Sequence, residues 1–139
     1  MKMKEDKRGD KISEIEHYLE ELESIFPLNF EDYKHDFKIK SICERYFEKI
    51  VEAVVDLAFI VIKEKKLKIP EDDENSFDIL KDEKIISDAL AKKLIDAKSM
   101  RNIIAHEYGK IDDEMVFHAV IEELIPDVLE FIKCVKRLK

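Results

Sequence analysis

The sequence predicts an all-α protein, an up-and-down helical bundle of four main helices joined through short helices. Composition gives the first reason, because only two glycines and three prolines interrupt 139 residues, of which 45% are hydrophobic and 42% charged. Such a mixture is typical of long helices that bury one face and expose the other. Spacing gives the second reason: apolar residues recur at steps of three and four, and no stretch shows the alternation of a strand.

The length fits one domain with a single sizeable core, so we expect one helical domain over residues 1–139. The opening segment MKMKEDKRGD lacks an apolar period, and residues 1–10 are therefore expected to fray. The first main helix should follow and end near Pro27. Its apolar stripe consists of Ile12, Ile15, Leu19, Leu22 and Phe26.

The second main helix is predicted to run from about Asp36 to Lys65, after a short helical turn capped by Asn29. Apolar residues cover more than half of its circumference, so it must pack on several sides. Neighbours within the subunit and a second copy of the chain would supply those contacts, and we expect a homodimer. The polar remainder of the helix, which either faces water or lines a cleft, consists of Arg45, Lys49, Glu52 and Asp56.

The third main helix follows a loop. Residues 66–75 contain a proline and four acidic residues, and they are predicted to form the main loop of the protein. Ser76 should then cap a short helix, and Ser87 should cap the third main helix. We expect that helix to run from residue 88 to about residue 106 and to stop at Gly109.

The last main helix should begin at Asp112, whose side chain is suited to cap it. Pro126 lies inside this helix and should kink it, because the proline ring clashes with the carbonyl of Glu122. The inward stripe of the helix consists of Val116, Val120, Leu124, Val128, Ile132 and Val135.

Charge and hydropathy limit the classes of function. A net charge of −8 argues against a general nucleic-acid binder, so an RNA ligand would need local positive charge, such as two copies of Arg101 in one dimer cleft. The acidic exterior also suits a basic protein partner. The longest nearly apolar run, Ala53 to Ile62, is far shorter than the roughly 20 residues that span a membrane. We expect a cytoplasmic protein without membrane contact.

The cysteines and histidines predict neither a metal nor a cofactor. Cys43 and Cys134 lie inside helical patterns without metal-ligand spacing, and are expected to be reduced core residues. His17 and His35 each follow an acidic residue at metal-ligand spacing, but a dinuclear site needs inward-facing ligands from four helices. His17 and His118 lie two residues past inward positions, so they should point outward, and all three of these histidines are expected to face solvent.

The segment RNIIAHEY, from Arg101 to Tyr108, carries the candidate site. It brings a guanidinium, an amide, an imidazole and a phenol to the end of the predicted third main helix. On an ideal helix Arg101 and His106 are separated by about 140°, so they cannot share one face, whereas Asn102 and His106 can. A site that uses all of them needs the helix to unwind near its end, or needs two subunits.

The order Arg101, four residues, His106, one residue, Tyr108 resembles the signature of the HEPN superfamily. The resemblance extends from about Ile12 to Leu138 and includes ERYFEKIVEAVVDLA, SFDILKDEKIIS and the triplet MRN that begins at Met100. It is closest to the HepT branch, whose members are toxins encoded beside a minimal nucleotidyltransferase antitoxin of the MntA type. The resemblance therefore implies an all-α endoribonuclease toxin with such an antitoxin as its partner.

The resemblance implies cleavage of RNA by the RNA's own 2′-hydroxyl, without a metal ion. His106 is suited to the proton transfers, since imidazole in general exchanges protons near neutral pH. Arg101 is suited to hold the phosphate, because its planar fork matches phosphate oxygens and keeps its charge. Asn102 and Asp56 are the supporting candidates. Tyr108 is implied to be adenylylated by the nucleotidyltransferase, or to contact RNA itself.

Two other classes of function stay open at this point. A catalytically silent HEPN module would bind a nucleotide or the nucleotidyltransferase partner through the same residues. A purely structural dimeric bundle would have no site at all, since Arg and His near a helix C-terminus are also favoured by the helix dipole. Substitution of Arg101 or His106 separates the nuclease from the other two, because it relieves growth arrest only if the protein is a nuclease.

Overall fold

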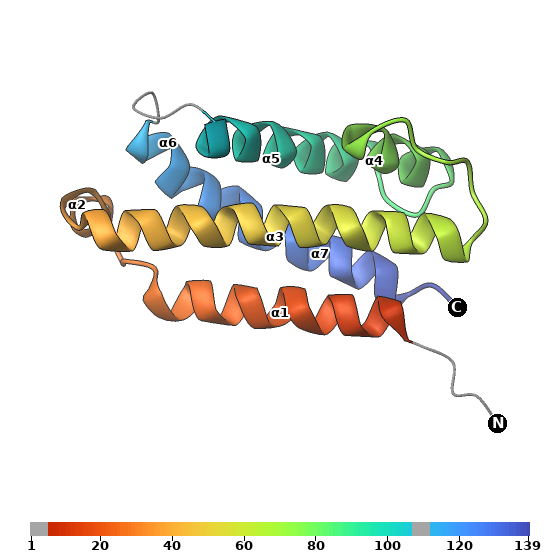
Figure 1. The fold of residues 1–139 in the computed structure, drawn as a ribbon, viewed down its shortest axis with the longest axis horizontal. Helices are drawn as coiled ribbons and strands as arrows, with labels where there is room; N and C mark the ends of the chain where they lie inside the picture. Colours follow the sequence, from red (N-terminus) through yellow and green to blue (C-terminus); the bar gives the residue numbers. More distant parts are fainter. Residues whose placement is uncertain (1–5, 107–111) are drawn as a thin grey trace.

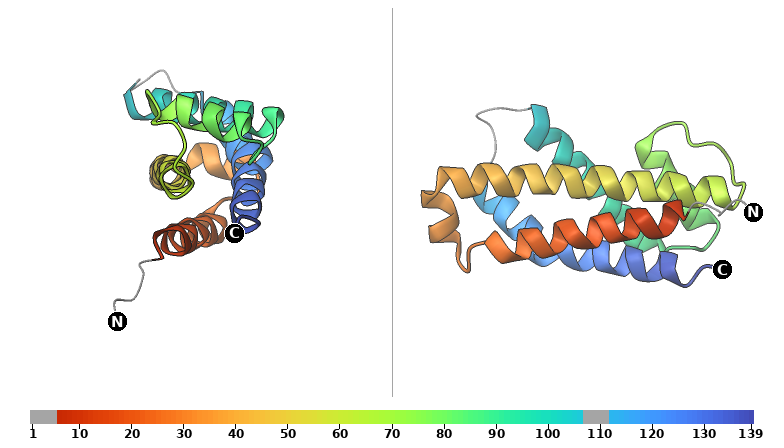
Figure 2. Two further views of the ribbon diagram at one scale, coloured as in Figure 1. Left: turned by 90° about the vertical axis from the view of Figure 1, so that its right-hand side faces the viewer. Right: turned by 60° about the horizontal axis from the view of Figure 1, so that its bottom comes forward.

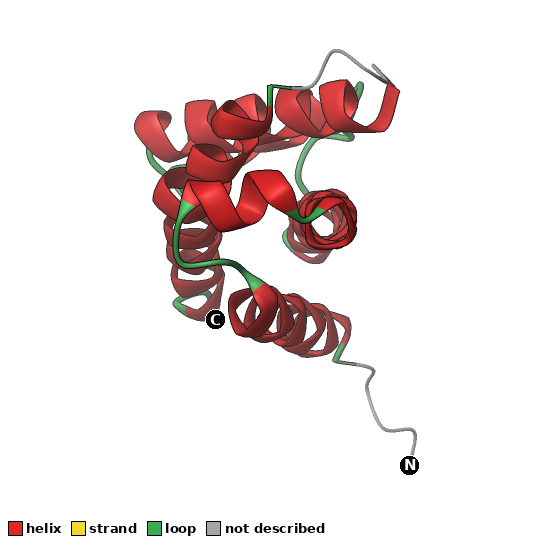
Figure 3. Ribbon diagram, turned by 90° about the vertical axis from the view of Figure 1, so that its left-hand side faces the viewer, coloured by secondary structure: helices red, strands yellow, loops and turns green. Residues whose placement is uncertain are grey.

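The computed structural model describes residues 6–106 and 112–139, and helices account for most of both ranges (Figure 1). Within these two ranges, four long helical runs and two short helices follow in the order α1 Lys7–Ile25, α2 Phe30–His35, α3 Phe37–Glu64, α4 Asp73–Asp82, α5 Asp88–His106, α6 Asp113–His118, η1 Ala119–Leu124 and α7 Ile125–Lys136. The last three elements follow one another without a break and form the fourth run. No strand occurs in these two ranges (Figure 3), and the all-α bundle is confirmed.

α3 occupies the middle of the arrangement. It packs on α1 along one side and on α4 and α5 along another, while α5 in turn contacts α7. Two turned views show α1 and the α4–α5 pair on either side of α3, with α7 on the side of the bundle opposite α3 (Figure 2). The core side of α3 buries residues such as Phe47, Ile50, Leu57 and Val61. Each such side chain contributes about 1.5–3 kcal/mol to folding, so α3 is the main apolar support of the bundle.

The N-terminal end of α1 differs from the expectation. Residues 1–10 were expected to fray, which is wrong for residues 7–10, because α1 already begins at Lys7. The Asp6 carboxylate accepts the backbone N–H of Gly9 at 2.9 Å and caps the helix. Arg8 then ties the first turn to α3, since its Nε donates to Glu64 at 2.9 Å. A cap and a long-range ion pair thus order a segment that has no apolar stripe.

The start of α4 also differs from the expectation. Ser76 does not cap this helix, because Asp72 takes that position and accepts the N–H of Asn75 at 2.7 Å. Ser76 lies inside the helix, is buried, and donates its hydroxyl to the carbonyl of Asp73 at 2.5 Å. The loop predicted over residues 66–75 therefore extends too far, because its last three residues belong to α4. Acidic residues favour a first helical turn through the helix dipole, so the chain becomes helical earlier than the serine suggested.

The fourth run begins as expected and contains an irregularity near Pro126. Asp112 caps α6 by accepting the N–H groups of Glu114 and Met115, and the predicted inward stripe is buried. The residues before the proline form the π-helix η1, in which the N–H of Ile125 bonds to the carbonyl of Val120. A wider turn suits this position because proline has no N–H and its ring crowds the preceding turn. The expected disturbance thus takes the form of a π-helical segment.

Other expectations concern the cysteines and the membrane. Cys43 is buried and Cys134 half-buried, and both are free thiols. Burial raises the pKa of the Cys43 thiol to about 11, so this side chain behaves as a small neutral core residue. Within residues 6–106 and 112–139, no helix combines the length and the apolar character needed to cross a bilayer.

Candidate functional site

The candidate site lies on the C-terminal half of α5, which differs from the half that precedes it. Ser87 caps the helix by accepting the N–H of Leu90 at 3.1 Å, as predicted. Leu90 and Leu94 are buried and fix the first half against the core. In the second half Ile104 is buried, while the polar side chains of the RNIIAH segment reach the surface. The core thus holds one face of α5 and leaves another to present polar groups.

Arg101 has an incomplete set of partners. One of its terminal nitrogens, Nη2, donates to Oε1 of Glu52 on α3, and the other, Nη1, lies 3.5 Å from Oδ1 of Asn102. Its Nε is buried and has no acceptor among the described residues. The Arg101 side chain is 22% exposed, against 46% for that of Glu52. A guanidinium that is largely buried and still carries a free donor is suited to receive an additional anionic acceptor.

Asn102 connects Arg101 to a second cation. Lys98, one turn earlier on α5, donates from Nζ to Oδ1 of Asn102 at 3.0 Å. The same ammonium lies 3.6 Å from Oδ2 of Asp73 at the start of α4. The Lys98 side chain is only 15% exposed, so this ion pair is better shielded than an ordinary surface pair. A polar network therefore runs from α4 through α5 to α3 and holds Asn102 and Arg101 in place.

His106 is the last residue of α5, and its side chain is exposed. No hydrogen bond or ion pair joins it to another residue within the described ranges. Arg101 and His106 stand five residues apart on one helix, which separates their directions by about 140°. A single chain therefore does not bring the guanidinium and the imidazole to one face. The predicted requirement for local unwinding or for a second copy remains.

Asp56, the second supporting candidate, contacts a different helix. Its Oδ2 lies 3.5 Å from Nζ of Lys11 on α1, and Lys11 also contacts Glu14 at 2.8 Å. The acidic residue that contacts Arg101 is Glu52, one turn earlier on α3. Sequence reasoning placed both acids in one polar stripe and had no signal to separate them. Their distinction depends on how α1 and α5 pack on either side of α3.

The remaining predicted residues fall into two groups. Tyr108, together with the expected stop at Gly109, lies outside the described residues. His17, His35 and His118 are exposed and approach acidic residues on their own helices, with His17 at 3.3 Å from Glu21. Their outward orientation is confirmed. Within the described ranges, no three His, Cys, Asp or Glu residues form a group that could hold a metal ion.

Two pockets in the described part of the chain lie away from Arg101. One, of about 260 Å³, lies between α5 and η1 and is lined in part by Met100 and Asp127. Burial raises the pKa of the Asp127 carboxyl, which Lys93 at 3.8 Å partly offsets. The other opens near the start of α1 and the end of α3. Neither lining includes Arg101, Asn102 or His106.

The fold and this surface define an all-α bundle that presents an arginine, an amide and an imidazole near the end of one helix. The family model described as "Ribonuclease HepT-like" matches residues 15–135, and the chain belongs to this HepT-like family. The family assignment made from the sequence resemblance is thereby confirmed.

The relatives span most of this chain. The mRNA nuclease HepT of Shewanella oneidensis is 24% identical over 127 residues, which cover 91% of this chain and 94% of that protein. The tRNA nuclease HepT of Aphanizomenon flos-aquae is 28% identical over 106 residues, which cover 76% of this chain and 72% of that protein. Both similarities therefore concern most of each chain and not an isolated motif.

A solved structure supports the fold assignment. The tri-AMPylated Shewanella oneidensis HEPN toxin in complex with MNT antitoxin matches this structure with a TM-score of 0.89 at 24% sequence identity. The match covers 97% of this chain and 100% of that chain. The HEPN fold expected from the sequence is confirmed.

Proposed function

We propose that this protein is an endoribonuclease toxin that cleaves RNA through the RNA's own 2′-hydroxyl. One observation carries the proposal: in a member of the HepT-like family, Arg101 is half-buried and its Nε has no acceptor among the described residues. Phosphate oxygens, like those of a carboxylate, match the geometry of a guanidinium fork. The relatives named mRNA nuclease and tRNA nuclease support RNA as the source of that phosphate.

The proposed reaction needs no external nucleophile. The 2′-oxygen forms a bond to the adjacent phosphorus, the bond from phosphorus to the 5′-oxygen breaks, and a 2′,3′-cyclic phosphate and a 5′-hydroxyl result. One proton leaves the 2′-hydroxyl and one reaches the departing 5′-oxygen, and both transfers are within the chemistry of His106. Arg101 stabilises the charge that gathers on the phosphoryl oxygens. The internal nucleophile is the reason why we expect the reaction to proceed without a metal ion.

The site requires a homodimer in this proposal. Arg101 and His106 point about 140° apart on α5, so Arg101 of one copy would act with His106 of the other across a twofold axis. Asn102 and Lys98 keep Arg101 in position through the network described above. Glu52 makes the acidic contact with Arg101, and Asp56 remains a second supporting candidate on the same helix.

Regulation by a nucleotidyltransferase partner forms the second part of the proposal. The related Shewanella oneidensis toxin is AMPylated and bound to an MNT antitoxin. We extend this to Tyr108: its phenol oxygen would form a bond to the α-phosphorus of ATP, and pyrophosphate would leave. The attached AMP adds bulk and negative charge, which opposes RNA binding. Mass spectrometry after incubation with the partner and ATP should show AMP on the peptide that contains Tyr108, and a Tyr108→Phe variant should lack it.

A catalytically silent HEPN module is the second candidate, and one contact favours it. Glu52 neutralises part of the Arg101 guanidinium in the single chain, as it would in a site that no longer acts on phosphate. The two candidates differ in a cleavage assay with purified protein and RNA in the presence of EDTA. We expect cleavage by the wild type and a loss of about 10³-fold for Arg101→Ala and for His106→Ala.

The control for this assay is His118→Ala, which removes an exposed histidine from another helix. It should retain the activity of the wild type. Termini that carry a 2′,3′-cyclic phosphate would support the proposed chemistry. A wild type that leaves RNA intact and does not arrest growth would remove the nuclease proposal in favour of the silent module.

A further inference from the structure

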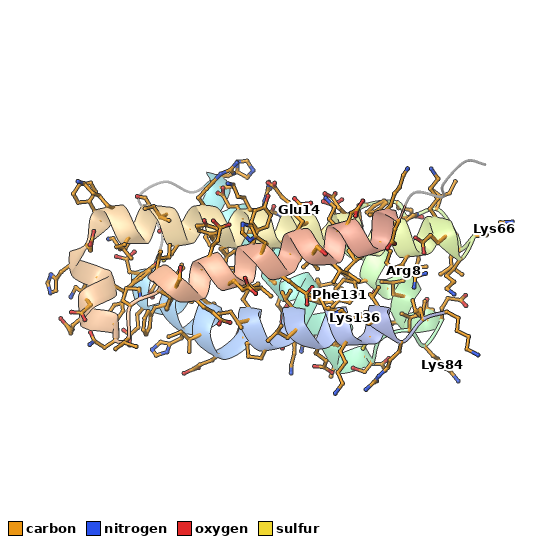
Figure 4. All side chains as sticks on the ribbon, turned by 90° about the horizontal axis from the view of Figure 1, so that it is seen from below. Arg8, Glu14, Lys66, Lys84, Phe131 and Lys136 are labelled. Carbon is orange, nitrogen blue, oxygen red and sulfur yellow. The ribbon has the colours of Figure 1, made fainter. Side chains whose placement is uncertain are left out.

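A basic pocket lies beside the last turns of α3, at the C-terminal end of that helix. It has a volume of about 980 Å³ and is lined by the start of α1, the last turns of α3 and Lys139. Five basic side chains and two acidic ones contribute to its lining. In a protein of net charge −8, this is a local excess of positive charge of the kind that binds phosphates. Figure 4 shows the labelled Arg8 and Lys66 at this end of the bundle.

Ion pairs and hydrogen bonds give the basic pocket fixed walls. Arg8 donates to Glu64 on α3 and, through Nη1 at 3.2 Å, to the carbonyl of Leu138. Lys65 donates from Nζ to the carbonyl of Lys139 at 2.9 Å. Lys63, in contrast, is exposed and makes no ion pair with another described residue. The walls are therefore held by paired side chains, while Lys63 offers a charge to a ligand.

An aromatic ring adds a second feature to the basic pocket. Phe59 lies one turn before Lys63 on α3, lines the pocket and is half-buried. A basic groove that includes an exposed aromatic face is the combination that binds single-stranded nucleic acid, because phosphates meet cations and a base stacks on the ring. A small inorganic anion would not use the ring. The lining thus favours an RNA strand among anionic ligands.

The basic pocket is aligned with the candidate site along α3. Phe59 and Lys63 follow Glu52 by seven and eleven residues, so all three project within about 40° of one another on an ideal helix. Glu52 contacts Arg101, and Lys63 lies roughly 16 Å further along the helix axis. A strand that follows the exposed face of α3 would therefore reach both places.

We infer that the basic pocket is a secondary RNA-binding site, which holds phosphates and one base of a single-stranded substrate away from the bond that is cut. This inference rests on the proposed function only in taking RNA as the ligand. It assigns to Lys63 the phosphate contact and to Phe59 the stacked base. It also explains how an acidic protein gains affinity for RNA without a generally basic surface.

RNA binding by a cleavage-deficient protein tests this inference. In a His106→Ala background, fluorescence anisotropy would measure the Kd of a labelled single-stranded RNA over a range of salt concentrations. Lys63→Gln should reduce the slope of log K against log salt by about 0.7 and weaken binding about fivefold at 0.1 M salt, because one phosphate contact is lost. Phe59→Leu keeps an apolar side chain against the core and should weaken binding about tenfold through lost stacking.

The matched control is Lys38→Gln, which makes the same charge change on the same helix. Lys38 is exposed in the first turn of α3, roughly 37 Å from Lys63 along the axis, and should leave Kd and salt slope unchanged. Circular dichroism would establish that each variant keeps its helices. Equal binding by the Lys63→Gln and Lys38→Gln proteins would overturn the inference, and so would a background protein that does not bind RNA.

The result separates the two proposals. A wild type that binds RNA through Lys63 but does not cut it would contradict the proposed function and leave the basic pocket as an RNA site. If the wild type cuts RNA and the Lys63→Gln and Lys38→Gln proteins have equal kcat/KM, the proposed function stands and the inference about the basic pocket fails. Loss of binding to the nucleotidyltransferase partner alone, with RNA binding intact in Lys63→Gln, would assign the pocket to an acidic protein surface and overturn the inference.

Discussion

Two arginines of this protein, one on α1 and one on α5, each contact a glutamate of α3. They differ in the contacts that their remaining guanidinium nitrogens make. Arg8 binds Glu64 and Arg101 binds Glu52, and both arginine side chains are about one fifth exposed, at 18% and 22%. Arg8 uses Nε and Nη2 on Glu64 and Nη1 on the carbonyl of Leu138. Arg101 leaves its buried Nε without an acceptor in the described part of the chain.

The difference separates a structural arginine from one that is suited to bind a ligand. A buried donor without an acceptor costs free energy, on the order of 1–3 kcal/mol, so a saturated guanidinium is the better choice wherever stability alone decides. Arg8 meets that criterion and ties α1 to α3 and to the end of the chain. Arg101 does not, and its free donor is explained if a phosphate oxygen completes the set in the bound state.

The largest effect should come from exchanging the fork of Arg101 for a point charge. Arg101→Lys keeps the positive charge but loses the paired donors, and we expect RNA cleavage to fall about 100-fold. The free energy of unfolding should change by less than about 0.5 kcal/mol, because the unsatisfied Nε disappears together with the contact to Glu52. Cleavage kinetics and urea unfolding of the same preparation measure both. Full activity in this variant would break the comparison.

The same substitution at Arg8 should act on stability. Arg8→Lys loses the two donors that meet Glu64 and the one that meets Leu138, and the free energy of unfolding should fall by about 1 kcal/mol. Urea unfolding monitored by circular dichroism measures the change. An unfolding free energy that matches that of Arg101→Lys would mean that the number of satisfied donors does not distinguish the two sites.

A smaller effect is expected from the acidic partner of Arg101. Glu52→Gln keeps an oxygen that accepts from Arg101 but removes a negative charge close to the expected phosphate, so KM for RNA should fall about threefold while kcat changes less than twofold. Glu23→Gln, which makes the same charge change at an exposed position on α1, serves as the control. Equal KM values in the two variants would show that Glu52 does not act on Arg101 in the bound state.

The sequence predicted helix positions correctly where a capping residue and an apolar periodicity indicated the same helix. Ser87 caps α5 and Asp112 caps α6 as predicted, and the inward stripe of the fourth run is buried in full. The prediction was wrong where several polar residues competed for one role. Near α4, Asp72 rather than Ser76 became the cap, since local sequence offers both and only the observed helix start selects one.

The sequence was sufficient to name the candidate-site residues on α5, but not the side chains that contact them. Arg101, Asn102 and His106 lie close together in the sequence, and the resemblance to a family signature was sufficient to propose them. Glu52 was named in the polar stripe, but Asp56 was chosen as the supporting acid, because the stripe is 49 residues away from Arg101 at Glu52 and both acids fit it equally well. Lys98 was missed because a lysine on a helix usually indicates only a solvated face.

The sequence by itself determined the helices, most of their ends, the apolar face of each, and the family to which the chain belongs. These are properties of neighbouring residues, since helical periodicity and capping depend on side chains within about one turn. The tertiary structure decided which acid meets Arg101, that each guanidinium nitrogen of Arg8 has an acceptor while Nε of Arg101 has none among the described residues, and that distant basic residues join in one pocket. Those features depend on the rotation and the axial position of one packed helix against another, which the interlocking of core side chains fixes and the periodicity of a single helix leaves open.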